Sequence, residues 1–367
     1  MRAGYGEKTR DFFAKNTNPQ LLIDFAGVKI FESATVDTNI LLFDKGTNEH
    51  KTLCAVTNKQ NKDSVKNLSV FVQQQGFACN FGGSDSWVIL SPIEQNIKRK
   101  IEATGIPLKD WDIQINYGIK TGFNDAFIIS TEKRDEILAN CQTEDERGRT
   151  AEIIRPILRG RDIKRYGYNW TGLWLINTHN GVKGKLPRIH IEDYPAVKAH
   201  LDQHWDKIST RTDKGDTPYN LRNCAYMEDF SRPKIVWGNL NLTASYALVE
   251  DDSFINAPSP MIVPASKYLL AVLNSKLADY YIRQLGVTRN GGYFEYKPMF
   301  VEKLPVPANC SKETMLFIEA CVDASDETAI DKTVYSLYGL TDEEKLLVEE
   351  STTQDISILR ELSDSLS

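Results

Sequence analysis

The segment SKYLLAVLNSKLADYYIRQLG, residues 266–286, is the feature that most constrains the fold. Ser266 suits a helix N-cap and Gly286 a helix stop, so the pattern predicts one continuous helix between them. Its apolar residues recur at every fourth position: Leu269, Leu273, Leu277 and Tyr281. A helix with a single apolar face is stable only when that face packs against other elements. The segment therefore predicts a packed globular domain.

Other segments predict helices and strands in alternation. Ser91, Pro92 and Glu94 form an N-cap, a first-turn proline and a capping box for a helix that ends at Gly105. Further helices are expected at residues 7–16, 131–141 and 195–208. Apolar runs of strand length lie at residues 21–25, 38–43, 127–130, 173–177, 234–240 and 244–249. The fold class is therefore mixed α/β, without a repeat period.

Composition limits the class of protein. A length of 367 residues with 41% hydrophobic residues suits two or three domains with real cores. No stretch approaches the roughly 18 apolar residues of a membrane helix, and the start MRAGYGEKTRDFF has no hydrophobic signal region, so we expect a cytoplasmic protein without a membrane partner. Six scattered cysteines without a Cys-x-x-Cys pair predict free thiols, with neither a zinc ribbon nor a redox motif.

Charge is distributed unevenly along the chain. The net charge is −6, but residues 311–367 contain 14 acidic and 4 basic residues, which leaves 40 basic and 36 acidic residues in the rest. One window, RPILRGRDIKRYGYNW, combines five cations with three aromatic residues: Arg155, Arg159, Arg161, Lys164 and Arg165, followed by Tyr166, Tyr168 and Trp170. Clustered cations with interleaved aromatics are typical of nucleic-acid binding, and the alternative is a solvated surface strip.

The bend YGIKTGFNDAFII, residues 117–129, resembles a phosphate cradle only superficially. In a P-loop the lysine follows the last glycine and a helix begins there. Here Lys120 and Thr121 precede Gly122, and FNDAFIIS after them reads as a strand. The spaced glycines of a dinucleotide-binding loop do not occur either. The bend is either an ordinary turn or a loop that presents Lys120, Thr121 and Asn124.

Two further patterns have the spacing of catalytic or metal sites. His200 and His204 lie one helical turn apart, but the metalloprotease glutamate is missing and an exposed helix face is the alternative. Asp279 with Glu295 and Lys297 has the spacing of a magnesium-dependent nuclease, although Glu-x-Lys also arises by chance in a chain with 26% charged residues. We therefore expect no metal site in this chain.

A series of segments resembles a known family. In order, these are YGIKTGFNDAFII, EIIRPILRGRDIKRY, GLWLINTHNG, YPAVKAHLDQHWDKISTRTDKGDTPYNLR, SRPKIVWGNL, LLAVLNSKLADYYI and FVEKLPVP. Together they resemble the C-terminal specificity domain of TaqI-like adenine DNA methyltransferases, which also occurs in fused type IIG restriction-modification enzymes. The resemblance runs from about Trp111 to about Glu350, and the closing IDKTVYSLYGLTDEEKLLVEE is similar to the family's C-terminal tail.

The N-terminal stretch resembles the last helix and strands of the methyltransferase catalytic domain. Carried over, Phe31 would stack on the flipped adenine, since an aromatic face compensates for lost base stacking. The alternative for Phe31 is a strand residue in a core. The resemblance thus implies the remnant of a Rossmann-like methyltransferase sheet in residues 1–50 and a connecting segment in 51–110. An α+β target-recognition domain would follow in 111–310 and an acidic helical tail in 311–367.

The chain departs from the family in one respect. It has neither the Gly-rich loop that binds S-adenosylmethionine nor an Asn-Pro-Pro-Tyr motif, so we expect it to bind no cofactor and to be inactive alone. The full-length enzyme would use S-adenosylmethionine, and its fused form would also restrict DNA. The resemblance implies double-stranded DNA and a methyltransferase domain, upstream or separate, as partners.

The implied function is sequence-specific DNA recognition. The residues expected to contact DNA form three patches: Lys120, Thr121 and Asn124; Arg155, Arg159, Arg161, Lys164 and Arg165; and Arg289, Asn290, Tyr293 and Lys297 at a Gly-Gly hairpin tip. For each patch the alternative is a turn or surface strip without DNA contact. The alternative function is a protein-interaction subunit of a restriction-modification or phage-defence complex, without DNA binding of its own.

Overall fold

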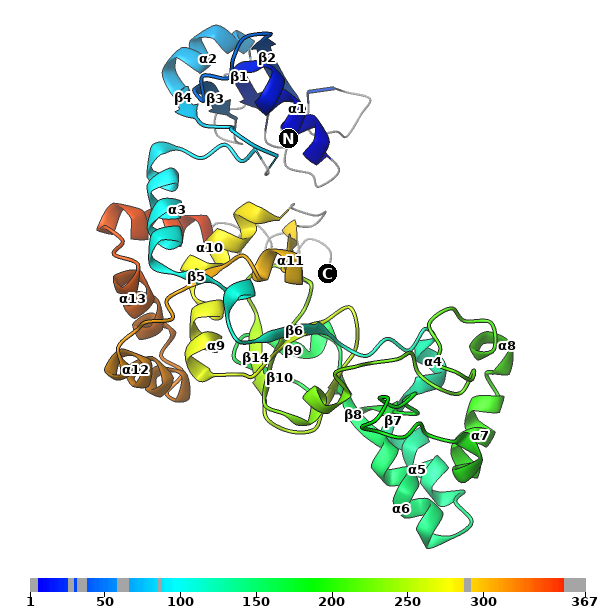
Figure 1. Ribbon diagram of the computed structural model, residues 1–367. Helices are drawn as coiled ribbons and strands as arrows, with labels where there is room; N and C mark the ends of the chain where they lie inside the picture. Colours follow the sequence, from blue (N-terminus) through cyan, green and yellow to red (C-terminus); the bar gives the residue numbers. More distant parts are fainter. Residues whose placement is uncertain are drawn as a thin grey trace. The chain divides into compact units, whose positions relative to one another are not determined.

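The computed structural model describes residues 6–25, 30–31, 38–57, 66–84, 87–286 and 292–352. The chain divides into two compact units, the first made of residues 1–103, 284–287 and 340–345, and the second of residues 104–283, 288–339 and 346–367. Figure 1 shows the helices and strands of both units. Among the described residues, no helix is long and apolar enough to cross a bilayer.

A four-stranded mixed sheet forms the first unit, with the order β2-β1-β3-β4. Its strands are β1 (Asn18–Asp24), β2 (Asn39–Asp44), β3 (Thr52–Val56) and β4 (Phe77–Cys79). Strand β1 is antiparallel to β2 and parallel to β3, and β3 is antiparallel to β4. With one parallel pair among its described strands, the sheet does not by itself identify a Rossmann-like remnant, which stays a prediction.

The helices described in the first unit are α1 (Glu7–Asn16), α2 (Leu68–Gln75) and α3 (Pro92–Thr104). Two of these three, α1 and α3, begin where the sequence predicts them, and α2 was not predicted. At the start of α3 the Glu94 carboxylate accepts the Ser91 N–H at 2.7 Å and the Ser91 hydroxyl accepts the Glu94 N–H at 3.4 Å, so the capping box is confirmed. The strands predicted at 21–25 and 38–43 are confirmed as β1 and β2.

Two four-stranded sheets lie at the centre of the second unit. One, of order β14-β12-β16-β6, is antiparallel throughout and contains β6 (Gln114–Tyr117), β12 (Lys234–Trp237), β14 (Tyr246–Val249) and β16 (Pro260–Val263). The other, of order β15-β8-β11-β7, contains β7 (Ile128–Ser130), β8 (Ile154–Leu158), β11 (Leu173–Ile176) and β15 (Phe254–Ile255). Both sheets contribute to one apolar core, in which Ile157, Leu175 and Val236 are fully buried.

Helices and short strand pairs complete the second unit. Several helices gather around β7 and β8, as Figure 1 shows: α4 (Asn124–Phe127), α5 (Thr131–Ala139), α6 (Glu144–Ile153), α7 (Pro195–Asp202) and α8 (Trp205–Ile208). The short antiparallel pairs are β5 (Ile106–Pro107) with β18 (Pro305–Val306), β9 (Ile163–Lys164) with β10 (Gly167–Tyr168), and β13 (Leu240–Asn241) with β17 (Phe294–Glu295). The helix predicted at 195–208 is therefore interrupted between α7 and α8.

The long helix predicted at residues 266–286 is two helices, α9 (Lys267–Asn274) and α10 (Lys276–Leu285). At the break the Asn274 amide pairs with β14, accepting the Tyr246 N–H and donating to the Tyr246 carbonyl, both at 2.9 Å. Ser275 adopts an extended conformation, and its hydroxyl accepts the Ala278 N–H at 3.2 Å. The prediction of one helix was wrong because these two side chains replace helical hydrogen bonds with partners on the sheet and at a new N-cap.

The C-terminal part of the described chain is helical, as expected. After α11 (Pro298–Val301) come α12 (Lys312–Asp323) and α13 (Glu327–Leu337), both of which pack against α9. Residues 342–352 are helical as well.

Candidate nucleic-acid interface

The bend at residues 117–129 is an anchored loop. Gly118 lies so close to the neighbouring chain that a β-carbon would come within 2.2 Å of the Ile255 carbonyl oxygen, and Gly122 has a φ of +72°. Thr121 is 1% exposed, and its hydroxyl donates to Asn124 at 2.6 Å, while Arg211 donates to its carbonyl. Thr121 therefore stabilises the loop and presents no group at the surface of this structure.

Lys120 and Asn124 are the exposed members of the first patch. The Lys120 ammonium lies 2.8 Å from an Asp213 carboxylate oxygen, with its side chain 56% exposed. Asn124 begins α4, a single helical turn that precedes β7. The strand predicted for FNDAFIIS is thus confirmed only in its second half, since the first half forms this turn.

Some cations of the second patch are engaged, which means that they already form an ion pair within the domain, and others are available to a ligand. Arg159 is engaged: its Nε and Nη2 donate to the two carboxylate oxygens of Asp162, each at 3.0 Å, and Asp162 is 3% exposed. Arg165 is engaged too, because it lies 2.5 Å from a Glu327 oxygen of α13 and also donates to the Asn274 carbonyl. These two arginines therefore hold the domain together.

Arg161 and Lys164 are the available members of this patch. Both side chains are exposed, and in the part of the chain that the structure describes neither forms an ion pair, although Lys164 donates to the Arg161 carbonyl at 2.8 Å. Arg155 is intermediate, since it forms an ion pair with Asp252 and its side chain is 30% exposed. Trp170 is 41% exposed and packs edge-on against Trp174.

Only part of the third patch lies within the described residues, because Arg289 and Asn290 fall outside them. Tyr293 is 42% exposed next to β17. The Lys297 ammonium lies 2.9 Å from the Glu295 carboxylate, which is buried. The hairpin tip expected around the two glycines also lies outside the described residues.

Phe31, the residue expected to face a flipped base, is 51% exposed. The alternative that it is a core residue therefore does not hold in this structure. Its role toward a base stays a prediction, and residues 26–29 and 32–37 on either side lie outside the described residues.

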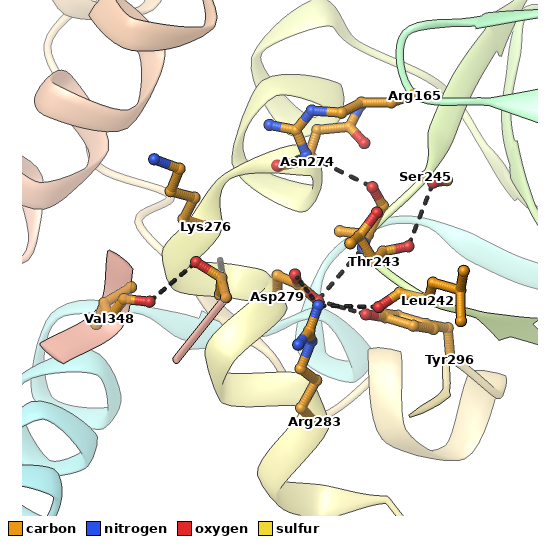
Figure 2. A network of polar contacts seen from close by, with 12 residues as sticks. Arg165, Leu242, Thr243, Ser245, Asn274, Lys276, Asp279, Arg283, Tyr296 and Val348 are labelled. Atoms are coloured by element: carbon orange, nitrogen blue, oxygen red, sulfur yellow. Dashed lines mark hydrogen bonds and ion pairs between the residues drawn. The ribbon is translucent and has the colours of Figure 1, made fainter. Parts of the chain in front are cut away.

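The side chain of Asp279, the first residue of the nuclease pattern, is surrounded by hydrogen-bond donors of the protein. Figure 2 shows Asp279 on α10 facing Arg283 and Tyr296. The Arg283 Nε and Nη2 each donate to Asp279 at 2.8 Å, and the Tyr296 hydroxyl and the Ala244 N–H donate to the same carboxylate. Because four donors occupy this buried carboxylate, its oxygens are not presented to a magnesium ion. No cluster of metal-binding side chains occurs among the described residues.

The two histidines of HLDQH also have a structural explanation. His200 is 6% exposed, and its Nε2 lies 3.0 Å from the Ala126 carbonyl oxygen. Burial lowers the pKa of His200 below its ordinary value. The His200 and His204 rings pack edge-on with centroids 5.3 Å apart. His200 therefore lies in a buried position and not on the exposed helix face considered from the sequence.

The sequence reasoning did not single out a second group of cations, on the loop after β11. Lys183 and Lys185 are exposed, and the Arg188 guanidinium lies 3.0 Å from an Asp216 oxygen. The signal was present in NGVKGKLPR, which places three cations within six residues and beside two glycines. These residues lie between the segments that carry the family resemblance, and the window contains no aromatic residue.

Comparison with known proteins identifies the class of this domain. Residues 155–306 match the family model of the TaqI-like C-terminal specificity domain. The resemblance seen in the sequence is thereby confirmed for residues 155–306, which are similar to a TaqI-like specificity domain.

Individual relatives extend the similarity along the chain. The type II methyltransferase M.BstVI of Geobacillus stearothermophilus is 22% identical over 95% of this chain and 64% of its own length. The type II methyltransferase M.XhoI of Xanthomonas vasicola is 22% identical over 72% of this chain and 47% of its own length. The chain therefore spans less than two thirds of either relative.

A solved structure shares the fold. The type IIL restriction-modification enzyme MmeI, solved in complex with DNA, is similar with a TM-score of 0.53 and 11% identity. The similarity covers 93% of this chain and 46% of MmeI. This agreement shows a common fold between the mixed α/β chain and part of a restriction-modification enzyme.

The sequence that connects β3 to α2 in the first unit does not fit the donor loop of an S-adenosylmethionine site. A donor site needs a glycine-rich turn that leads from a strand into a helix, so that backbone N–H groups approach the ligand closely. In the described part of the first unit β3 leads into α2, but residues 57–67 between them contain no glycine. The next strand after β1 is β2, which pairs with it in the antiparallel sense. No step of a methyl transfer is therefore assigned to these residues.

Proposed function

We propose that this chain is the sequence-specific DNA recognition part of a type II methyltransferase or a fused restriction-modification enzyme that methylates the exocyclic amino group of adenine. The match of residues 155–306 to the specificity domain carries this proposal. Duplex DNA and a methyltransferase domain with its S-adenosylmethionine are the partners of the complete enzyme, which we place in the cytoplasm. The chain alone is expected to bind DNA and not to modify it.

Available cations within the matched domain support DNA binding. Arg161 and Lys164 project from η4 (Gly160–Asp162) and β9, where the Arg159–Asp162 pair holds the backbone. A fixed backbone with exposed cations is suited to phosphate contacts, and an arginine that reaches a base edge can pair with guanine. Trp170 adds an exposed aromatic face that follows them in the sequence.

A binding titration tests the proposal. The purified chain is titrated into a labelled duplex of about 30 base pairs at several salt concentrations, with fluorescence anisotropy as the measurement. If six or more phosphates are contacted, affinity should fall roughly 10³-fold between 50 and 200 mM salt. Selection from a randomised duplex pool should then recover a preferred site. Absence of duplex binding at low salt would contradict the proposal.

Adenine as the methylated base requires a separate test. The complete enzyme, supplied with labelled S-adenosylmethionine, should transfer the methyl group to the selected duplex. Replacement of the target adenine by purine, which lacks the exocyclic amino group, should abolish the transfer. Transfer to the purine duplex, or to cytosine, would contradict this part of the proposal.

The protein-interaction alternative rests on the first unit. Strand β2 lies at the edge of its sheet and exposes several large apolar side chains: Ile40, Leu42 and Phe43. An exposed apolar edge strand is suited to pairing with another chain. Under this alternative the chain would form a stable complex with a separate methyltransferase chain and would bind no DNA without it, which size-exclusion chromatography with the anisotropy assay would detect.

A further inference from the structure

Two loops of the second unit, residues 118–124 and 213–223, are joined by one buried arginine. Arg211 is 7% exposed, and its Nη1 donates to the carbonyls of Thr121 and Asp213, the latter at 2.8 Å. Its Nη2 donates to the carbonyls of Pro218 at 3.0 Å and Asn220 at 2.6 Å. The guanidinium thus connects carbonyl groups from both loops, which fixes their relative positions.

A third loop, residues 180–188, is joined to the same assembly by an asparagine. The Asn180 amide oxygen accepts the Asp216 N–H at 2.8 Å, and its Nδ2 donates to the Asp216 carboxylate at 3.0 Å. The Asn220 amide donates to the Ile189 carbonyl at 2.9 Å just beyond this loop. Three segments that are distant in sequence therefore form one continuous surface.

This surface, which we call the three-loop face, has an excess of positive charge. Its cations are Lys120, Lys183, Lys185, Arg188, Lys214 and Arg222, and its carboxylates are Asp213 and Asp216. Asp213 is shared between Lys120 at 2.8 Å and Arg222 at 3.2 Å, and Asp216 pairs with Arg188. Lys183 and Lys185 have no ion-pair partner among the residues that the structure describes. Six cations against two carboxylates leave four positive charges on a face of a chain whose net charge is −6.

The face is also hollowed. A cavity of about 820 Å³ is lined by residues 180–188 together with Asp216, Asn223, Cys224 and Ala225. Lys183, Lys185 and Arg188 all line it, and the one carboxylate in its wall is the one paired with Arg188. A cavity with this excess of ammonium and guanidinium groups is suited to phosphates.

We propose that the three-loop face binds the phosphate backbone of duplex DNA, with Lys183 and Lys185 as direct phosphate contacts. This inference rests on the proposed function and specifies where on the domain the backbone is held. The cations are spread over three loops, and the cavity is one part of a wider charged surface, which fits an extended polyanion better than a single small anion. Arg211 acts as a positioning residue for this face.

The test compares matched charge changes in the full chain. The variant Lys183→Glu with Lys185→Glu alters the face, and the control Lys312→Glu with Lys332→Glu makes the same change of charge at exposed positions of α12 and α13. Circular dichroism verifies that both variants fold. Affinity for the duplex is measured by anisotropy against salt. The face variant should bind about tenfold or more weakly at low salt, and its slope of log K against log salt should be shallower by about 2, or roughly 1 for each lost phosphate contact.

The outcomes separate this inference from the proposed function. If the chain binds duplex and the face variant binds as the control does, the inference is overturned and the proposed function stands. If the wild-type chain binds no duplex, both are overturned. Saturable binding of ATP without duplex binding would indicate a nucleotide pocket and also overturn the inference. A variant with Lys183→Gln and Lys185→Gln should retain part of the affinity, because it removes the contacts without adding repulsion.

Discussion

The substitution Asp279→Ala should destabilise the second unit, because it leaves the Arg283 guanidinium without its carboxylate. The side chains of Asp279 and Arg283 are 6% and 7% exposed, so water does not replace the lost partner. Removal of one partner of a buried ion pair raises the free energy of the folded state by about 3–5 kcal/mol. The lower end of that range applies here, since Arg283 still donates to the Leu242 carbonyl at 3.0 Å and lies 4.3 Å from the centre of the Phe294 ring.

Thermal and urea unfolding measure this loss. A destabilisation of about 3 kcal/mol corresponds to a melting temperature lower by roughly 6–12 °C for a unit of this size. Trp237 is a convenient fluorescent reporter, because its indole N–H donates to the Tyr296 carbonyl at 2.6 Å, next to the cluster in Figure 2. The double variant Asp279→Leu with Arg283→Met should lose less stability than the sum of its single changes, because it leaves no unpaired charge.

The unfolding measurement and a cleavage assay together decide between a structural and a catalytic role for Asp279. A loss of stability below about 1 kcal/mol would refute the argument from burial. Magnesium-dependent cleavage of duplex DNA that is abolished by Glu295→Ala, with unchanged folding, would instead support the nuclease pattern. We expect no such cleavage, since four donors occupy the Asp279 carboxylate.

Three further predictions follow from individual contacts. Arg159→Ala should lower the unfolding free energy by about 1.5–3 kcal/mol in urea because it leaves a buried carboxylate unpaired, whereas Arg161→Ala should leave stability unchanged and weaken duplex binding in the anisotropy assay. Burial lowers the pKa of His200, so this residue contributes stability that is present above its unfolded pKa of about 6.5 and is lost as the pH falls through the folded pKa. The variant His200→Gln should therefore flatten the dependence of the melting temperature on pH in that range. Gly118→Ala should destabilise the chain measurably in the same urea assay, because its β-carbon would clash with the Ile255 carbonyl, while an alanine at Gly148, where nothing lies within 4 Å, should not.

Local signals in the sequence were sufficient for several helices, among them α1, α3 and α5, and for some of the strands. The capping box at Ser91 and Glu94 predicted α3 because its donors and acceptors lie within four residues of each other. The break at Ser275 could not be predicted, because the competing partner of Asn274 is Tyr246, 28 residues away. The apolar spacing of the segment is the same for one helix or two.

For the candidate interface, the sequence predicted a window of clustered cations but not which of them are available. Arg159 and Arg161 are two positions apart and chemically identical, yet one is paired with a buried carboxylate and the other is exposed without an ion-pair partner among the described residues. Whether a cation is available depends on which acid lies within about 3 Å of it in space. Arg165 shows the same effect over a longer range, since its partner Glu327 lies 162 residues away.

The sequence by itself determined the family resemblance, the positions of several capped helices and of some strands, and the uneven distribution of charge. These properties depend on residue order, local hydrogen bonds and composition, all of which can be read along the chain. Only the tertiary structure decided which cations hold the domain together, which are available to a ligand, and that residues 118–124, 180–188 and 213–223 form one charged face. That face exists because Arg211 and Asn180 connect loops that no sequence pattern places together.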